Sequence, residues 1–217
     1  MKNYTFLFTT IILFSCTSVE VQEFNDNKLK IDENVIFLEY LENDWQKNLN
    51  QNPLFASYVG DKRSNDKINS NSIIQFNEER SSEIESLDKL YSIDQSKLSE
   101  ENQLNYKLKE FGLKSSIGLS DFPTYFLRLN QRGGIQSFYE TGNRLVYTSK
   151  EDYFDWLSRL KQFSANINNS LEINKEGLAK GITQPKIIVE GVVTQIDAIL
   201  KTDIDNNPYL QVFLNGR

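Results

Sequence analysis

The stretch "GLAKGITQPKIIVEGVVTQIDAIL", residues 177–200, decides whether the fold contains strands. β-Branched residues crowd its middle, and such residues are typical of strands. Its apolar residues nevertheless recur at 188, 192, 196 and 199, which is the period of a helix. β-Branching lowers helix propensity by only a few tenths of a kcal/mol per residue, whereas burying one such side chain contributes roughly 1.5–3 kcal/mol. We therefore predict a buried helix over 185–201, with Gln184 as its cap and Pro185 in its first position.

Outward from this segment, apolar residues recur with the helical period along most of the chain. Pro, Gly and polar stretches separate the periodic segments. The predicted helices cover about 34–50, 53–60, 73–91 and 100–117, followed by a long helix that starts after residue 149 and runs or bends into 171–179. No stretch shows the sustained alternation of a strand, and no internal repeat is evident. We predict an all-α fold, an irregular array of several helices.

The apolar positions also predict which side of each helix is buried. For the helix over 100–117, capped by Ser99, they are Leu104, Leu108 and Phe111. For the long helix they are Tyr153, Trp156, Leu157, Leu160, Phe163 and Ile167. Thr148 and Glu151 have the spacing of a capping box, so Thr148 is the predicted cap of the long helix.

The composition excludes several classes of function. The 217-residue chain has a net charge of −6 with acidic and basic residues mixed along it, so nucleic acid is not an expected partner. It contains no His, which excludes Ser-His-Asp and Cys-His catalysis and the common His-based zinc sites. Its single Cys, Cys16, excludes an intrachain disulfide and a thiolate cluster. We predict no catalytic residue, no metal ligand and no cofactor in this chain.

The N-terminus predicts a lipid anchor. Lys2 precedes an apolar run that is too short to span a membrane. A Leu three residues before Cys16 and a Ser directly before it resemble a bacterial lipobox. We therefore predict a signal peptide over 1–15, a lipidated Cys16 that binds the membrane, and a flexible tether over 16–33. Thr17, where an Asp would favour the inner membrane, favours the outer membrane of a bacterial cell envelope. The alternative is an ordinary secretory signal with an incidental Cys.

Carboxylates are among the few remaining candidates for chemistry. Asp152 with Asp155, and Glu78 with Glu79, have the side chains that acid-base and oxygen-ligand sites use. Their neighbours place them on solvated helix faces, so we predict no site there.

A glycine-rich stretch is the second candidate. Arg132 stands beside Gly133 and Gly134, where it could receive a carboxylate ligand. Gln131, Arg132, Gly133 and Gly134 are therefore the candidate substrate-cleft residues. The alternative for Arg132 is a loop arginine in a structural ion pair.

Four stretches together resemble the bacterial domain of unknown function 885 family (DUF885). They are NPLFASYVGDKRSNDKI (52–68), LSEENQLNYKLKEFGLKSSI (98–117), LNQRGGIQSFY (129–139) and the stretch 147–196, which contains Gly-x-x-x-Gly-x-x-x-Pro from Gly177 to Pro185. Their order and spacing carry the resemblance, which covers about 34–205.

The resemblance implies a largely α-helical, secreted or lipid-anchored protein of the zinc metallopeptidase type. In such proteins a His-Glu-x-x-His helix and a further Glu hold the zinc, and the Glu of the motif activates the bound water. Those residues lie in the family's C-terminal half, beyond Arg217. We therefore expect 34–217 to be a truncated N-terminal part, a scaffold that forms one wall of a substrate cleft and is inactive alone, with zinc and a peptide substrate belonging to the complete protein. The alternative is a self-sufficient helical lipoprotein that binds a ligand or a partner.

Overall fold

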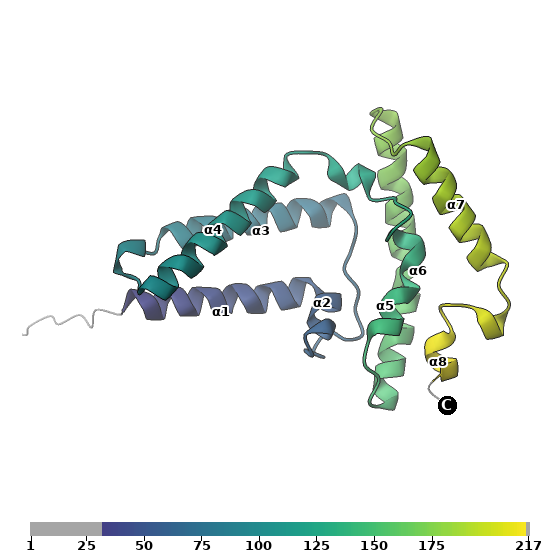
Figure 1. Ribbon diagram of the computed structural model, residues 1–217, viewed down its shortest axis with the longest axis horizontal. Helices are drawn as coiled ribbons and strands as arrows, with labels where there is room; N and C mark the ends of the chain where they lie inside the picture. Colours follow the sequence, from purple (N-terminus) through teal and green to yellow (C-terminus); the bar gives the residue numbers. More distant parts are fainter. Residues whose placement is uncertain (1–31, 216–217) are drawn as a thin grey trace, which may run out of the picture. The chain divides into compact units, whose positions relative to one another are not determined.

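Residues 32–215 are described by a computed structural model, and every regular element in that range is helical (Figure 1). The α-helices are α1 (Glu33–Gln51), α2 (Pro53–Tyr58), α3 (Ile73–Tyr91), α4 (Glu100–Ser120), α5 (Tyr139–Arg144), α6 (Lys150–Ala179), α7 (Lys186–Leu200) and α8 (Gln211–Asn215). The 3-10 turns are η1 (Gln95–Lys97), η2 (Thr124–Leu127), η3 (Ile135–Ser137) and η4 (Ile204–Asn206). The predicted all-α class is confirmed. The predicted signal peptide, Cys16 and the predicted tether as far as residue 31 lie outside the described residues.

An apolar core joins α1, α3 and α4. Each of these helices begins at a side-chain cap, formed by Asp32, Ser72 and Ser99 respectively. The core consists of Phe37, Tyr40, Leu90, Ile93, Leu98, Tyr106 and Leu113. α3 packs against both α1 and α4, and Figure 1 shows the three helices side by side. We call this group the apolar bundle.

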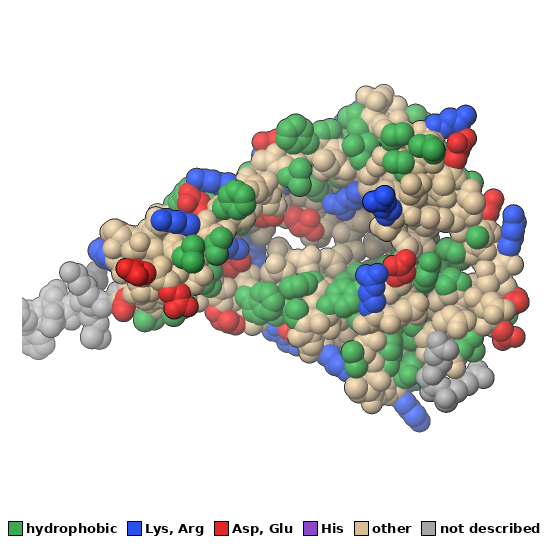
Figure 2. Space-filling view, in the orientation of Figure 1, with side chains coloured by type: hydrophobic (Ala, Val, Ile, Leu, Met, Phe, Trp, Pro, Cys, Tyr) green, Lys and Arg blue, Asp and Glu red, His purple; other side chains and the backbone are tan. Residues whose placement is uncertain are grey.

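The apolar side of α4 does not face the apolar bundle. Leu104, Leu108 and Phe111 are 59%, 60% and 72% exposed, so the prediction that they form the buried face is wrong. The buried positions are Asn102, Tyr106 and Leu113. The helix is therefore turned about its axis relative to the prediction. Polar contacts explain this orientation, because Asn102 Nδ2 donates to Asn34 Oδ1 at 2.9 Å and Lys109 pairs with Asp44 of α1. Figure 2 shows green apolar side chains on the surface along α4.

α6 is one continuous helix, the first of the two predicted alternatives, but its cap lies one residue later than expected. The Ser149 hydroxyl accepts from the backbone N–H of Asp152, and the Asp152 carboxylate accepts from the backbone N–H of Ser149 at 2.8 Å. Asp152 is the third helical residue after Ser149 and closes the capping box from there, so Ser149 and Asp152 take the place predicted for Thr148 and Glu151. The predicted inner face is correct for Trp156, which is buried, whereas Leu157 and Ile167 are exposed.

The Gly-x-x-x-Gly-x-x-x-Pro stretch turns the chain from α6 into α7. A side chain at Gly177 would lie 2.8 Å from the carbonyl oxygen of Ile182 and 3.1 Å from Phe126, so only glycine lets η2 approach α6 this closely. Gly181 follows the helix end with φ of +72°. Pro185 is then the N-cap of α7, and the first helical residue is Lys186.

α7 is a helix, as predicted, but it is not buried. Val192 is its one buried residue, while Ile187, Val193, Ile196 and Leu200 are exposed. Gln184 does not cap the helix; its side-chain amide donates to the carbonyl of Leu127 instead. The strong helical period of this segment therefore predicts its secondary structure correctly and its burial wrongly.

Arg159, a buried arginine of α6, forms hydrogen bonds that hold residues 53–72 against α6. Arg159 is 0% exposed. Its Nε donates to the carbonyl of Lys67 at 2.8 Å, and its Nη2 donates to Ser57 Oγ at 2.6 Å and to the carbonyl of Pro53 at 3.2 Å. One guanidinium thus satisfies groups of α2 and of the loop that follows it.

Amide side chains extend this contact along α6. Asn71 Nδ2 donates to the carbonyl of Asn166 at 2.9 Å, and Asn166 Nδ2 donates to the carbonyl of Asn69 at 2.8 Å. Gln162 Nε2 donates to the carbonyl of Asp66 at 2.7 Å. We call these contacts, together with those of Arg159, the polar joint.

Over the described range 32–215, no helix is both long and apolar enough to cross a membrane.

Candidate functional site

The candidate cleft residues lie in an irregular segment between η2 and α5. Gln136 sets the shape of this segment: it is 6% exposed, and its Nε2 donates to the carbonyl of Asn130 and to Gln195 Oε1, both at 2.8 Å. A side chain at Gly134 would lie 2.4 Å from Gln136 Oε1 and 2.8 Å from the Asn130 carbonyl. Gly134 is therefore required for a close approach rather than for an unusual backbone angle, since its φ is −80°.

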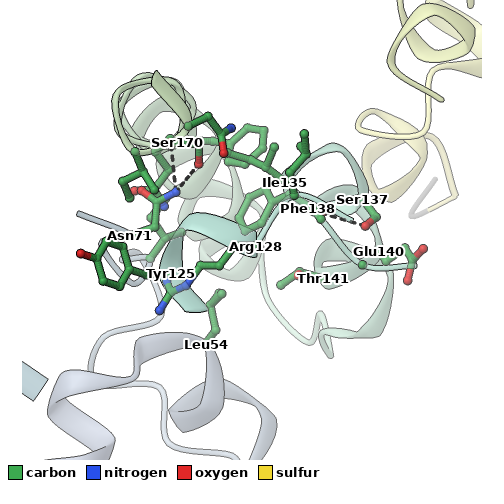
Figure 3. Close-up of a pocket in the computed structure, with 18 of the residues that line it drawn as sticks. Leu54, Asn71, Tyr125, Arg128, Ile135, Ser137, Phe138, Glu140, Thr141 and Ser170 are labelled. Atoms are coloured by element: carbon green, nitrogen blue, oxygen red, sulfur yellow. Dashed lines mark hydrogen bonds between the residues drawn. The ribbon is translucent and has the colours of Figure 1, made fainter. Parts of the chain in front are cut away.

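A cavity of about 390 Å³ lies between this segment, α6 and residues 54–71. We call it the central cavity. Its walls include Leu54, Ile68, Asn71, Tyr125, Arg128, Leu129, Gly133, Gly134, Ile135, Ser137, Phe138, Glu140, Thr141, Arg144, Phe163, Asn166, Ser170, Ile173 and Asn174. Its volume lies within the range of small-molecule sites, about 300–1,000 Å³. In Figure 3, Asn71, Tyr125, Arg128 and Leu54 lie on one side of it and Ser137, Glu140 and Thr141 on the other.

Aromatic side chains form the apolar wall of the central cavity. Phe138 stacks on Phe163 with ring centroids 4.3 Å apart and on Trp156 with centroids 5.4 Å apart. Tyr125 lies 4.3 Å from Phe126 and 4.8 Å from Phe76, again between centroids. These contacts fix the ring positions, so the wall is a rigid apolar surface.

The polar wall contains an amide whose orientation is determined. Asn71 Nδ2 donates to the Asn166 carbonyl and to Ser170 Oγ, the latter at 2.6 Å. A carbonyl accepts only from a donor, so the NH₂ group must face α6. Asn71 Oδ1 then points away from these partners, and it is buried with no hydrogen bond from any of the described residues.

A second cavity of about 240 Å³ lies on the other side of the irregular segment. Gln131 and Arg132 line it, together with residues of α7 such as Gln195 and Ile199. Ser137 and Glu140 line both cavities. The four candidate residues are therefore divided: Gly133 and Gly134 face the central cavity, and Gln131 and Arg132 face the second. Their contact with a substrate stays a prediction.

The candidate carboxylates are not grouped for acid-base chemistry. Asp152 is 4% exposed, so its predicted place on a solvated face is wrong. A hydrogen bond from Lys62 at 2.5 Å and those from the Thr148 and Ser149 backbones hold the pKa of Asp152 well below its usual range. Asp155 accepts from Asn65 Nδ2 at 3.0 Å. Both carboxylates therefore have structural partners. Among residues 32–215, no group of three or more His, Cys, Asp or Glu side chains is placed to hold a metal ion.

Most residues of the central cavity are not recognisable from the sequence. Asn166 and Ser170 follow Phe163 at helical spacing, so they share its side of α6, but they carry no apolar signal. Asn71 lies in a polar loop, where nothing in the sequence indicates a contact with α6. Arg128 lies only four residues before Arg132, and its position at the central cavity depends on η2.

The fold and its cavities define an all-α protein with a polar and aromatic cavity beside its longest helix. A family model described as "Bacterial protein of unknown function (DUF885)" matches residues 53–215. The match covers more than half of the chain, and the chain belongs to this family. Comparisons with curated proteins and with solved structures found no match.

Proposed function

We propose that this chain is the N-terminal helical scaffold, and one wall of the substrate cleft, of a lipid-anchored protein of the zinc metallopeptidase type. The exposed apolar side of α4 carries the proposal. Leu104, Leu108 and Phe111 occupy one helix face and are each more than half exposed. A contiguous apolar face of this kind marks a surface that packs against further polypeptide.

The cleft assignment rests on the irregular segment. Gly133 and Gly134 line the central cavity, and Gln131 and Arg132 line the second cavity. A peptide bound along this segment would meet both. The family resemblance supplies peptide as the substrate class.

The residues of this chain do not fit a zinc site of the His-Glu-x-x-His type. The sequence has no His, and such sites need two of them. The proposal therefore assigns zinc and the water-activating Glu to other polypeptide, and it gives this chain a structural and binding role.

Metal content and hydrolysis test this assignment. The chain is purified with its lipid in detergent, its zinc is measured, and a mixture of peptides is incubated with it. We expect less than about 0.1 zinc per chain at equilibrium with micromolar zinc, and no hydrolysis above background. One equivalent of tightly held zinc, or peptide cleavage by the purified chain, would refute the proposal.

Membrane attachment at the bacterial cell envelope is tested at Cys16. The expected result is that the chain sediments with outer membranes and takes up a labelled fatty acid, because two or three acyl chains anchor stably. Cys16→Ser abolishes the labelling and releases the chain from the membrane. A Cys16→Ser chain that remains in the membrane fraction contradicts the lipid anchor.

The central cavity favours a second candidate, a self-sufficient lipoprotein that binds a ligand or a partner. The reading frame after codon 217 discriminates between the two. A His-Glu-x-x-His motif in that frame supports the scaffold, whereas a stop codon together with stable, monomeric folding of the chain supports the binding protein.

A further inference from the structure

Arg128 is a cation at the rim of the central cavity without an anionic partner. Neither an ion pair nor a side-chain hydrogen bond of its guanidinium occurs among residues 32–215. Arg63, Arg80 and Arg144, by contrast, each pair with a carboxylate. Arg128 also lines a smaller cavity with Glu79 and Glu83, neither of which comes within ion-pair distance. A guanidinium in this position can bind a carboxylate through two parallel hydrogen bonds.

Asn71 offers an acceptor on the same side of the central cavity (Figure 3). Its Oδ1 is buried without a hydrogen bond, while its Nδ2 is held by α6. A buried acceptor without a donor is unfavourable, so a ligand N–H that reaches it relieves this cost. The oxygen has almost no exposed surface, so a ligand donor reaches it only after side chains of the cavity wall shift.

The remaining wall is apolar and rigid. Phe163 and Ile173 present apolar surface from α6, and the stacked Phe138 fixes the Phe163 ring. Glu140 and Arg144, on the α5 side, pair with each other at 3.0 Å, so this side adds little net charge. The cavity therefore combines one anion-binding group, one hydrogen-bond acceptor and an apolar surface.

We propose that the central cavity binds the C-terminal residue of a short peptide that ends in an apolar side chain. The terminal carboxylate binds Arg128, the N–H of the same residue donates to Asn71 Oδ1, and the side chain packs against Phe163 and Ile173. In a peptide these carboxylate and N–H groups belong to one residue, which matches the position of Arg128 and Asn71 on one side of the cavity. The inference rests on the proposed cleft and names the end of the peptide that this wall recognises.

Calorimetric titration of the full chain in detergent micelles tests the proposal, with protein-free micelles as the reference. The probes are N-acetyl-Ala-Phe, its C-terminal amide and 3-phenylpropanoate, which has the carboxylate and ring but lacks the N–H. We expect the acid to bind about tenfold or more tightly than the amide, and about threefold or more tightly than 3-phenylpropanoate.

Two arginine variants complete the experiment. Arg128→Gln should weaken the acid about tenfold and remove the preference for acid over amide. Arg63→Gln changes an exposed arginine that pairs with Asp61 and lines neither cavity, so it should leave the affinity within about twofold.

Equal affinity for acid and amide, an unchanged affinity in Arg128→Gln, or no binding of the acid up to about 5 mM would each overturn the carboxylate site. Binding of 3-phenylpropanoate as tight as that of the peptide would overturn the assignment to a peptide. The outcome is separable from that of the proposed function, because zinc binding or hydrolysis by this chain would refute the scaffold and leave these affinities unaffected.

Discussion

The apolar bundle and the polar joint are two solutions to the same problem of holding helices together. In the bundle, Phe37 and Leu90 are fully buried and pack in an aromatic and aliphatic core. In the joint, the fully buried side chain is Arg159, and its partners are mainly backbone carbonyls. Apolar burial is non-directional, whereas hydrogen bonds from a guanidinium require a fixed geometry. The bundle therefore supplies stability, and the joint supplies the position of the α2 loop against α6, which builds one side of the central cavity.

The largest expected effect comes from the apolar bundle. Phe37→Ala removes a ring that contacts Tyr40 and Tyr106, with centroids 6.3 Å and 6.0 Å away. We expect it to lower the free energy of unfolding by about 3–5 kcal/mol, because the loss of buried surface is joined by the cost of a cavity. Urea denaturation followed by circular dichroism measures the change.

Leu38→Ala is the control for Phe37→Ala. Leu38 is the next residue in α1 and is exposed. Its replacement should change the free energy of unfolding by less than about 0.5 kcal/mol. Ala is the best helix former, so neither change weakens the helix itself, and a similar loss in both variants would contradict the prediction that the burial of Phe37 decides the stability of α1.

The polar joint should be sensitive to shape as well as to charge. Arg159→Lys keeps the positive charge but removes the planar group that donates to Ser57, Pro53 and Lys67. We expect a loss of about 2–3 kcal/mol in the free energy of unfolding, since several buried acceptors lose their donor. Arg80→Lys, at an exposed pair with Asp121, should cost less than about 1 kcal/mol. Equal losses at the two sites would contradict the geometric role of Arg159.

The two regions also differ in how far the sequence predicts them. Helical periodicity predicts every long helix, and it predicts α3 with the bounds that the structure has. It works because a helix that buries one face must repeat its apolar residues every three to four positions. Caps and glycines then locate most of the helix ends.

The same reasoning fails where polar residues are buried. The buried side of α6 contains Asp152, Trp156 and Arg159, at helical spacing but of mixed polarity. Counting apolar residues alone rotates the predicted face toward Leu157 and Ile167, which are exposed. In α4 the same error selects Leu104, Leu108 and Phe111. A polar network compensates the burial of its members only when the partners meet in space, and the partners of Arg159 lie about a hundred residues earlier in the chain.

This failure also limits what could be predicted of the candidate site. Gly133 and Gly134 are recognisable from the sequence, and both line the central cavity. Arg128 and Asn71 are not recognisable, because their places depend on η2 and on the polar joint. Only tertiary structure brings the polar loop after α2 to the side of α6.

A smaller effect on the free energy of unfolding, and one that depends on pH, is expected at Asp152, where Lys62 contacts the start of α6. The pKa of Asp152 is lowered, chiefly by the hydrogen bond from Lys62, so folding favours the carboxylate. Its stabilisation is fully present above the unfolded pKa of about 4 and is lost as the pH falls from there toward the lower folded pKa. Asp152→Asn should therefore cost about 1 kcal/mol at pH 7, and the difference from wild type should shrink at pH 3.

Thermal unfolding at pH 7, 5 and 3 measures this dependence, with Glu151→Gln as the matched control. Glu151 is an exposed neighbour in the first turn of α6. A cost of Asp152→Asn that stays constant down to pH 3 would show that the capping hydrogen bonds, and not the charge next to Lys62, stabilise the start of α6.

The smallest expected effect on stability tests the exposed side of α4. Leu108→Gln and Phe111→Gln should each change the free energy of unfolding by less than about 0.5 kcal/mol, because neither side chain is buried in this chain. Leu113→Ala, on the buried side of the same helix, should cost about 2 kcal/mol or more. Urea denaturation and the fluorescence of a dye that binds apolar surface are measured on the same samples. Reduced dye binding in the two Gln variants, at unchanged stability, means that α4 has an apolar surface that the apolar bundle does not use. A large loss of stability in either variant would place this face inside the fold and remove the main support for a scaffold that packs against further polypeptide.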